Sequence, residues 1–165
     1  MKFVYWLREG AIAGRCGPDL RPWSLEAIRD NGFSAILSVN DGEAVHAARI
    51  KDLQMEYANI PLSANIPPRA GDRELCLSNL PEAMDFIQRG LDSGPVLVHC
   101  RSGKDRTGMT LAACLIAFEG YPAETAMDEV IGINPIAFSA EGWLDFGLEV
   151  LTEFSRHHRS LRPGK

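Results

Sequence analysis

The sequence predicts an α/β fold in which a small, mixed central sheet is flanked by helices. Short apolar stretches typical of strands alternate along the chain with segments of helical spacing, which is the pattern of α/β domains. One apolar stretch, at residues 95–98, leads through a loop of glycine and small polar residues into an apolar helix that begins near residue 107. In α/β sheets such a loop lies at the carboxyl end of its strand, where ligands bind.

The first part of the chain is typical of short strands and helices separated by turns. Ser24 is a suitable N-cap for a helix and Gly32 is suited to end it, because serine accepts hydrogen bonds from free N–H groups and glycine tolerates the left-handed conformation. The expected elements are strands at 3–7 and 11–14 joined by a turn at Glu9-Gly10, a helix at 25–31, a strand at 35–39, a turn at Asn40-Asp41-Gly42, a helix from 43 to 51 and a strand at 55–61.

The second part begins with a long loop at 62–72 that contains two prolines. Asp72 could cap the helix that follows it. The expected elements are a helix from 72 to 89, a strand at 95–99 and helices at 107–119, 123–131 and 140–158. Residues 156–165 are basic and are expected to form a frayed tail.

Length and composition favour one domain over residues 1–165, since a chain of this length can bury a full core without disulfides or metals. The net charge of −5 argues against nucleic acid as a partner. No stretch approaches the ~18 apolar residues of a membrane span, so no membrane insertion is expected. The four cysteines lack disulfide or metal-ligand spacing, and the first ten residues do not resemble a signal peptide. We therefore expect a cytoplasmic protein.

Residues 99–108, His-Cys-Arg-Ser-Gly-Lys-Asp-Arg-Thr-Gly, indicate the chemistry. A cysteine and an arginine separated by five small or polar residues can surround one phosphate, and the backbone N–H groups and the helix N-terminus converge on it. A Walker loop is excluded because Gly-Lys is followed by Asp105 and not by Ser or Thr. The residues expected to bind the phosphate are Arg101, Ser102, Gly103, Lys104, Asp105 and Arg106.

Each reactive side chain of this loop has an expected role. Cys100 is the candidate nucleophile, and the converging N–H groups and cations would favour its thiolate. Arg106 has a planar fork that can bind two phosphate oxygens at once. Thr107 can donate its hydroxyl to the sulfur and make it a better leaving group, and His99 is expected to orient the loop through hydrogen bonds.

The loop resembles that of the cysteine-dependent protein tyrosine phosphatases, in which His-Cys is followed by five residues, Arg and then Ser or Thr. The chain length and the position of the cysteine are similar to the compact dual-specificity branch. The resemblance implies hydrolysis of a phosphomonoester through a phosphocysteine at Cys100, without metal or other cofactor. It implies a phosphorylated protein as the partner, with phosphotyrosine as the first choice of substrate.

The sequence leaves the general acid open. The family usually places an aspartate on a mobile loop ahead of the cysteine, but residues 60–68 contain no carboxylate. Asp72 and Asp105 are equal candidates, and Asp41 ranks below both. Asp72 could instead only cap a helix, and Asp105 could instead only brace the loop through hydrogen bonds.

Three alternatives to a protein phosphatase follow from the same residues. Basic side chains at Arg101 and Lys104 resemble those of phosphoinositide phosphatases, whose head groups need extra positive charge. A phosphate-binding module without turnover would explain the missing loop aspartate. Similar cysteine loops also carry out sulfur transfer or arsenate reduction, although a loop that runs directly into a helix favours a phosphatase.

Overall fold

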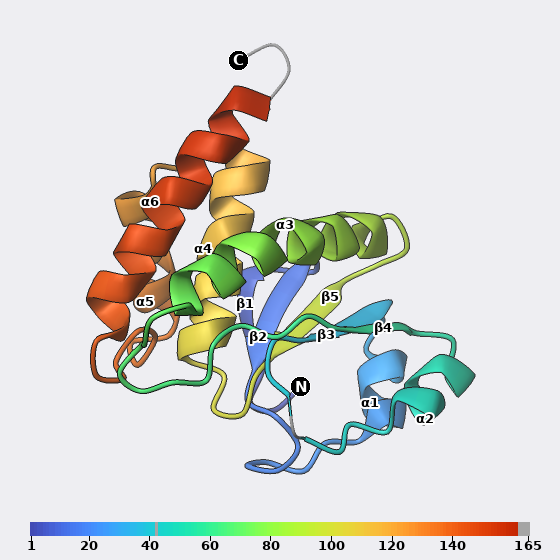
Figure 1. The fold of residues 1–165 in the computed structure, drawn as a ribbon. Helices are drawn as coiled ribbons and strands as arrows, with labels where there is room; N and C mark the ends of the chain where they lie inside the picture. Colours follow the sequence, from blue (N-terminus) through green and yellow to red (C-terminus); the bar gives the residue numbers. More distant parts are fainter. Residues whose placement is uncertain (42, 162–165) are drawn as a thin grey trace.

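Five strands form one mixed sheet in the order β1-β2-β5-β3-β4 (Figure 1). The computed structural model describes residues 1–41 and 43–161; Gly42 of the expected turn and residues 162–165 of the expected tail lie outside them. β1 pairs with β2 in antiparallel fashion, and the other neighbours are parallel. The small mixed sheet is therefore confirmed. The strands are β1 (Tyr5–Arg8), β2 (Ile12–Arg15), β3 (Ala35–Ser38), β4 (Glu56–Asn59) and β5 (Val96–His99).

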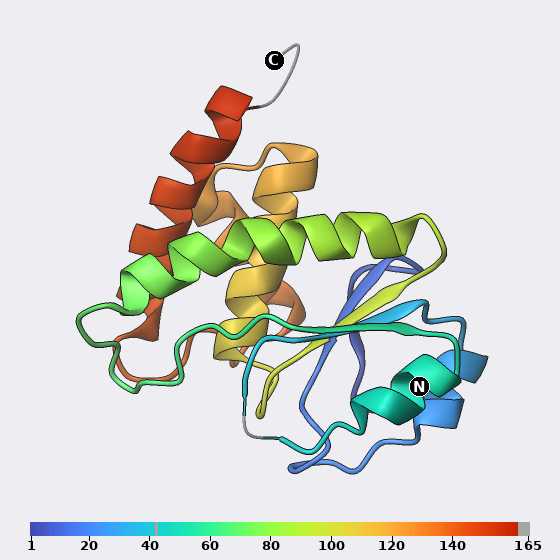
Figure 2. The same ribbon diagram turned by 45° about the vertical axis from the view of Figure 1, so that its right-hand side comes forward.

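Helices cover both faces of the sheet, and a separate hydrophobic core lies between the helices and the sheet on each face. α1 (Leu25–Asp30) and α2 (Ala47–Asp52) pack on one face, and Figures 1 and 2 show the four remaining helices on the other. These are α3 (Asp72–Leu91), α4 (Asp105–Glu119), α5 (Ala123–Ile133) and α6 (Trp143–Leu161). Alternate residues of β5 enter the two cores: Val96 and Val98 face the four-helix layer and Leu97 faces α1 and α2. Burial on both faces explains why this strand is continuously apolar.

The register of the three central strands determines where the functional loop lies. Arg15 at the end of β2 and Ser38 at the end of β3 both pair with His99 at the end of β5. The chain then turns through residues 100–104 into α4, whose first turn lies at the same edge of the sheet. Side chains from β2 and β3 are therefore level with the loop and can support it from both sides.

Several element boundaries differ from the sequence-based predictions. α2 begins at Ala47, not at residue 43, because the carboxylate of Glu43 accepts hydrogen bonds from Asn40 and from the backbone N–H of Asp19. Gly71 is the N-cap of α3, so the prediction of Asp72 as the cap is wrong by one position. α4 begins at Asp105, and α6 begins three residues later than expected.

The prediction of a frayed tail from residue 156 is also corrected, because α6 continues to Leu161. Two local contacts support the added turn. Arg156 pairs with Glu153 one turn earlier at 3.1 Å, and the rings of His158 and Phe154 lie 4.3 Å apart. Phe154 is itself buried in the core, so it ties this end of the helix to the domain.

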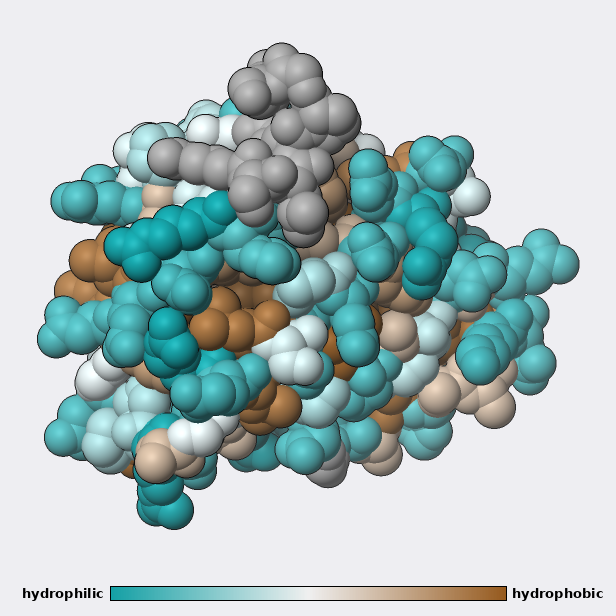
Figure 3. Space-filling view, turned by 45° about the horizontal axis from the view of Figure 1, so that its top comes forward, coloured by the Kyte–Doolittle hydropathy of each residue, from teal (hydrophilic) through white to brown (hydrophobic). Residues whose placement is uncertain are grey.

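The surface over the helical layer is mostly hydrophilic, with separate hydrophobic patches between the polar side chains (Figure 3). Such a mixture is usual for protein surfaces. Within the described residues, no helix is both long and apolar enough to cross a membrane.

Candidate active site

The sulfur of Cys100 is buried at the base of the loop and receives two hydrogen bonds. The backbone N–H of Gly103 donates to Sγ at 3.2 Å, and the Thr107 hydroxyl donates at 3.0 Å. The N-terminus of the 15-residue helix α4 follows directly. Donors aimed at one atom, together with the positive end of a helix, stabilise a negative charge there. The contact predicted between Thr107 and the sulfur is present.

The loop can take this shape only with glycine at position 103. Its φ is +71°, and a Cβ there would lie 2.5–2.7 Å from backbone atoms of Arg15 and Cys16. The glycine thus allows the loop to press against the end of β2 while its N–H remains directed at the sulfur. A neighbouring backbone bond, from Gly17 N to the carbonyl of Arg101 at 2.9 Å, joins the same two segments.

A small cavity of about 60 Å³ opens above the sulfur. Four loop residues predicted to bind phosphate or carry out the chemistry line it with Cys100: Ser102, Lys104, Asp105 and Arg106. Ser63, Ala64 and Ile66 form one wall, and Trp143 from the start of α6 completes the lining. A pocket with a thiol at its base, cations at its rim and an apolar wall suits a phosphate ester with an organic group.

Arg101 and Gly103, also predicted to bind phosphate, lie outside this lining. The Arg101 side chain is 62% exposed, and its guanidinium lies 3.9 Å from the carboxylate of Asp19. The Gly103 carbonyl is held by Tyr5 and Asn134 on the outer side of the loop. Arg101 is therefore available only to groups that extend beyond the cavity.

Arg106 lines the cavity and forms no ion pair with any carboxylate of the described residues. The nearest acidic neighbour in the sequence, Asp105, pairs with Lys104 instead at 3.2 Å. The fork of Arg106 therefore remains available for two oxygens of a bound oxyanion.

Asp105 is buried at the first position of α4 and its carboxylate faces the cavity. One oxygen accepts a 3.3 Å hydrogen bond from the backbone N–H of Ala140, and the other contacts Lys104. Lys104 also donates to the hydroxyl of Ser139 at 3.1 Å, which holds the ammonium group between the loop and residues 139–140. These contacts fix a carboxylate at the cavity that Cys100 also lines.

Asp72, the other candidate acid, does not line the cavity. Its carboxylate accepts a 2.6 Å hydrogen bond from the backbone N–H of Arg69 and two 3.0 Å bonds from the amide of Asn65. Burial opposes its charge, but the hydrogen bonds from Arg69, Asn65 and Ser63 outweigh this effect and lower the pKa of Asp72. These contacts brace the 63–72 loop and keep the group ionised.

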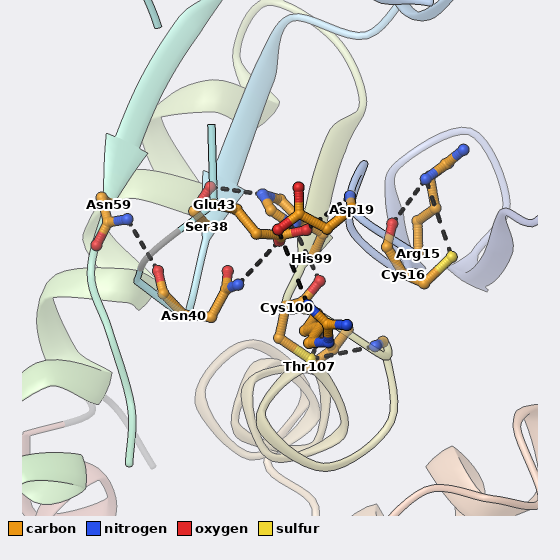
Figure 4. Close-up of polar contacts among 12 residues, drawn as sticks. Arg15, Cys16, Asp19, Ser38, Asn40, Glu43, Asn59, His99, Cys100 and Thr107 are labelled. Carbon is orange, nitrogen blue, oxygen red and sulfur yellow. Dashed lines mark hydrogen bonds and ion pairs between the residues drawn. The ribbon is translucent and has the colours of Figure 1, made fainter. Parts of the chain in front are cut away.

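His99 lies beneath the loop in a buried polar network (Figure 4). The carbonyl oxygen of Cys100 can only accept, so Nδ1 of His99 carries the ring hydrogen and donates to it at 3.1 Å, with Glu43 at 3.5 Å. Nε2 of the neutral ring then accepts from the Ser38 hydroxyl, which itself accepts from the Tyr57 hydroxyl at 2.8 Å. The imidazole therefore supports the loop from below, in line with the orienting role expected of it.

Burial lowers the pKa of His99, so the ring is neutral at pH 7. The unfolded chain takes up a proton near pH 6.5 that the folded chain does not, and stability must fall as pH drops below that value. We expect His99→Asn to lose the part of this pH dependence that His99 contributes. That part changes the free energy of unfolding by at most about 1.4 kcal/mol per pH unit. Urea unfolding at a series of pH values between 5 and 7.5 measures it. The exposed His46 provides the matched control, because His46→Asn should keep the wild-type slope of unfolding free energy against pH. If His99→Asn also keeps the wild-type slope, His99 is not the source of the pH dependence.

Sequence reasoning missed the side chains that support the site from a distance. Tyr5, Glu43 and Asn134 contact the loop or its supports only through the tertiary fold. Trp143 is buried in the core, but it also lines the cavity and donates to the carbonyl of Asn65 at 2.9 Å. None of these residues has a local pattern that marks it.

Two further features of the described residues bear on other chemistries. A larger cavity of about 560 Å³ lies at the opposite end of the sheet, near Ser34 and Glu56, and neither cysteine nor histidine lines it. No group of three or more His, Cys, Asp or Glu side chains within the described part of the chain is arranged to hold a metal ion.

Comparison with known proteins decides the family. Residues 1–142 match the model of the Swiss Army Knife protein DSP-PTPase phosphatase domain, PTP-SAK. The chain belongs to this dual-specificity phosphatase family. The resemblance deduced from residues 99–108 is thus confirmed, and the protein is a cysteine-dependent phosphatase of the compact branch. No curated protein sequence matches the chain significantly.

Solved structures share the fold of the phosphatase at low sequence identity. PTPMT1 superposes with a TM-score of 0.75 at 18% identity, over 96% of this chain and 97% of that one. Its complex with PI(5)P gives a TM-score of 0.73 at 19% identity, over 92% and 94%. Human DUSP28 gives 0.73 at 14% identity, over 96% and 97%. At these identities the likeness extends to the fold alone.

Proposed function

We propose that the phosphatase hydrolyses phosphomonoesters in two steps through a phosphocysteine at Cys100. One observation carries the proposal: the Cys100 sulfur, with Gly103 N and Thr107 Oγ1 directed at it, lies at the base of a cavity lined by Arg106. A nucleophile and a cationic fork in one small cavity are the requirements of phosphoryl transfer by covalent catalysis.

In the first step the thiolate of Cys100 attacks phosphorus. The S–P bond forms as the P–O bond to the ester oxygen breaks, and Asp105 gives its proton to that oxygen. Arg106 and the loop N–H groups bind the three other oxygens, whose charge they stabilise during transfer. In the second step water attacks phosphorus and gives a proton back to Asp105, the S–P bond breaks, and Thr107 and Gly103 stabilise the released thiolate.

Asp105 is our choice of general acid because of its position. Its carboxylate is buried at the cavity, whereas that of Asp72 points away into hydrogen bonds that favour its charged form. The proton for the leaving oxygen must come from a group within reach of the cavity, and of the two carboxylates only that of Asp105 lines it.

We expect Asp105→Asn to lower kcat/KM for an aryl phosphate by about 10²- to 10³-fold, because general acid catalysis contributes on this scale. The loss should be larger for phenyl phosphate than for p-nitrophenyl phosphate, since the poorer leaving group needs the proton more. The measurement is kcat/KM against pH for both substrates.

Asp72→Asn is the control for this test. We expect it to lower stability, because its new amide would face the N–H donors of Arg69 and Asn65, but to keep the wild-type dependence on the leaving group. If Asp72→Asn steepens the dependence on the leaving group and Asp105→Asn does not, the two roles are exchanged.

Phosphotyrosine on a protein is the proposed substrate, and a phosphoinositide is the second candidate. The cavity wall of Ile66 and Trp143 is apolar, which favours an aromatic ring next to the phosphate. The complex of PTPMT1 with PI(5)P and the exposed Arg101 beside the cavity favour the second candidate. Rates with a phosphotyrosine peptide and with PI(5)P, measured for wild type and Arg101→Ala, separate them: only the lipid rate should fall with the arginine.

A cytoplasmic location stays a prediction that is consistent with this chemistry. The four cysteines are free, and the mechanism requires Cys100 as a reduced thiol. A reducing compartment maintains that state.

A further inference from the structure

The carbonyl oxygen of Gly103 is held from outside the loop by two side chains that the proposed reaction does not use. The Tyr5 hydroxyl on β1 donates a hydrogen bond to it, and the Asn134 amide at the end of α5 donates another at 3.3 Å. The two donors are far apart in the sequence and meet at one atom of the loop.

The direction of this carbonyl controls the direction of the next N–H. In a trans peptide the C=O and N–H groups point to opposite sides. Because the Gly103 carbonyl points outward to Tyr5 and Asn134, the N–H of Lys104 points inward, toward the cavity that Lys104 lines. The preceding peptide is fixed separately, since the Gly103 N–H donates to the Cys100 sulfur.

The position of Tyr5 is built into the sheet. Tyr5 pairs with Gly14 on β2, and a Cβ at Gly14 would lie 2.5–2.7 Å from the Tyr5 ring and hydroxyl. Only glycine at position 14 therefore lets the ring cross β2 and reach the loop. Burial, followed by the charge of Cys100, raises the pKa of Tyr5, so the hydroxyl keeps its proton and remains a donor.

We propose that Tyr5 and Asn134 are positioning residues that aim the Lys104 N–H at a phosphoryl oxygen. They touch neither the substrate nor the sulfur, and they act by preventing rotation of the peptide between Gly103 and Lys104. The inference rests on the proposed function, because it requires an oxyanion in the loop. A preorganised donor costs no reorientation in the transition state, so its loss lowers both oxyanion affinity and turnover.

The test is Tyr5→Phe, which removes a single hydroxyl. We expect kcat/KM for p-nitrophenyl phosphate and affinity for vanadate each to fall about tenfold, the scale of one weakened hydrogen bond to a charged group. Tyr121→Phe is the matched control, because the Tyr121 hydroxyl contacts Arg8 and Glu129 away from the loop. It should leave both values unchanged.

Asn134→Ala removes the second donor, and it serves as the test of the proposal if Tyr5→Phe does not fold. Tyr5→Phe/Asn134→Ala should lose more than either single variant, about 100-fold, because the carbonyl is then free to turn inward. Thermal unfolding of all variants separates this effect from a general loss of stability, which would lower Tm without changing vanadate affinity at a temperature where the protein is folded.

A direct readout is the amide NMR signal of Lys104 in the Cys100→Ser protein, titrated with inorganic phosphate. We expect a shift that is much reduced when Tyr5→Phe is added and retained when Tyr121→Phe is added. If the two tyrosine variants behave alike in activity, vanadate affinity and this shift, the positioning role of Tyr5 is wrong, but the proposed function still stands. If the wild-type protein neither hydrolyses aryl phosphates nor binds phosphate, the proposed function itself fails.

Discussion

Cys100→Ser is expected to abolish hydrolysis of aryl phosphates, with kcat reduced by at least about 10⁴-fold. A serine hydroxyl is a much weaker nucleophile than a thiol sulfur, and the two donors and the helix N-terminus directed at Cys100 are placed to stabilise negative charge on that sulfur. The measurement is turnover of p-nitrophenyl phosphate by both proteins under reducing conditions.

Phosphate binding provides the necessary control for this variant. The serine is nearly the same size, so Arg106 and the loop N–H groups should still bind phosphate, and isothermal titration should give an affinity within a few-fold of the wild type. Cys16→Ser is the matched control for loss of a thiol, since Cys16 lies outside the cavity lining. Turnover that survives in Cys100→Ser and depends on another residue would contradict covalent catalysis at this position.

Arg106→Lys is expected to lower kcat/KM for the same substrate by about 10²- to 10³-fold although the charge is retained. Lysine offers a point charge on a flexible chain, whereas the guanidinium binds two oxygens in one plane and can follow them as the phosphoryl group moves to sulfur. The loss should therefore appear in kcat as well as in KM, which steady-state kinetics resolves.

The control for Arg106 is the other arginine of the loop. Arg101 carries the same charge one residue from Cys100, but its side chain is 62% exposed and does not line the cavity. Arg101→Lys should change the rate with a small aryl phosphate less than twofold. Equal losses in the two variants would indicate that only the total charge of the loop matters and that the fork has no special role.

The sequence predicted the fold well because its central strands are buried on both faces. Val96, Leu97 and Val98 are apolar without alternation, which is typical of a strand buried on both faces. The predicted ends of helices were less accurate where a side chain forms tertiary hydrogen bonds. The local sequence predicts the start of a helix at Glu43. Its carboxylate instead accepts hydrogen bonds from Asn40 and Asp19, and the helix begins only at Ala47.

The site was predictable where its residues are consecutive in the sequence and unpredictable where they are brought together by the fold. The proposed nucleophile and the proposed phosphate-binding groups all lie within the consecutive residues 99–108. Tyr5 and Asn134 reach the same loop across the sheet and from α5, and no local pattern distinguishes them from core or turn residues. The sequence could not separate the two candidate acids, Asp72 and Asp105, because the difference between them lies in the fold: Asp105 lines the cavity, whereas Asp72 accepts hydrogen bonds from Asn65 and Arg69.

The central claim is that catalysis passes through a phosphoryl group on Cys100, and one measurement tests it most directly. Wild-type protein is mixed with p-nitrophenyl phosphate, quenched during turnover, digested and analysed by mass spectrometry. The account requires a phosphorylated Cys100 peptide that is present during turnover and absent both from Cys100→Ser and after substrate is exhausted. Active wild-type enzyme that carries no phosphoryl group on Cys100 at any time, and releases phosphate without an initial burst of nitrophenol, would contradict it.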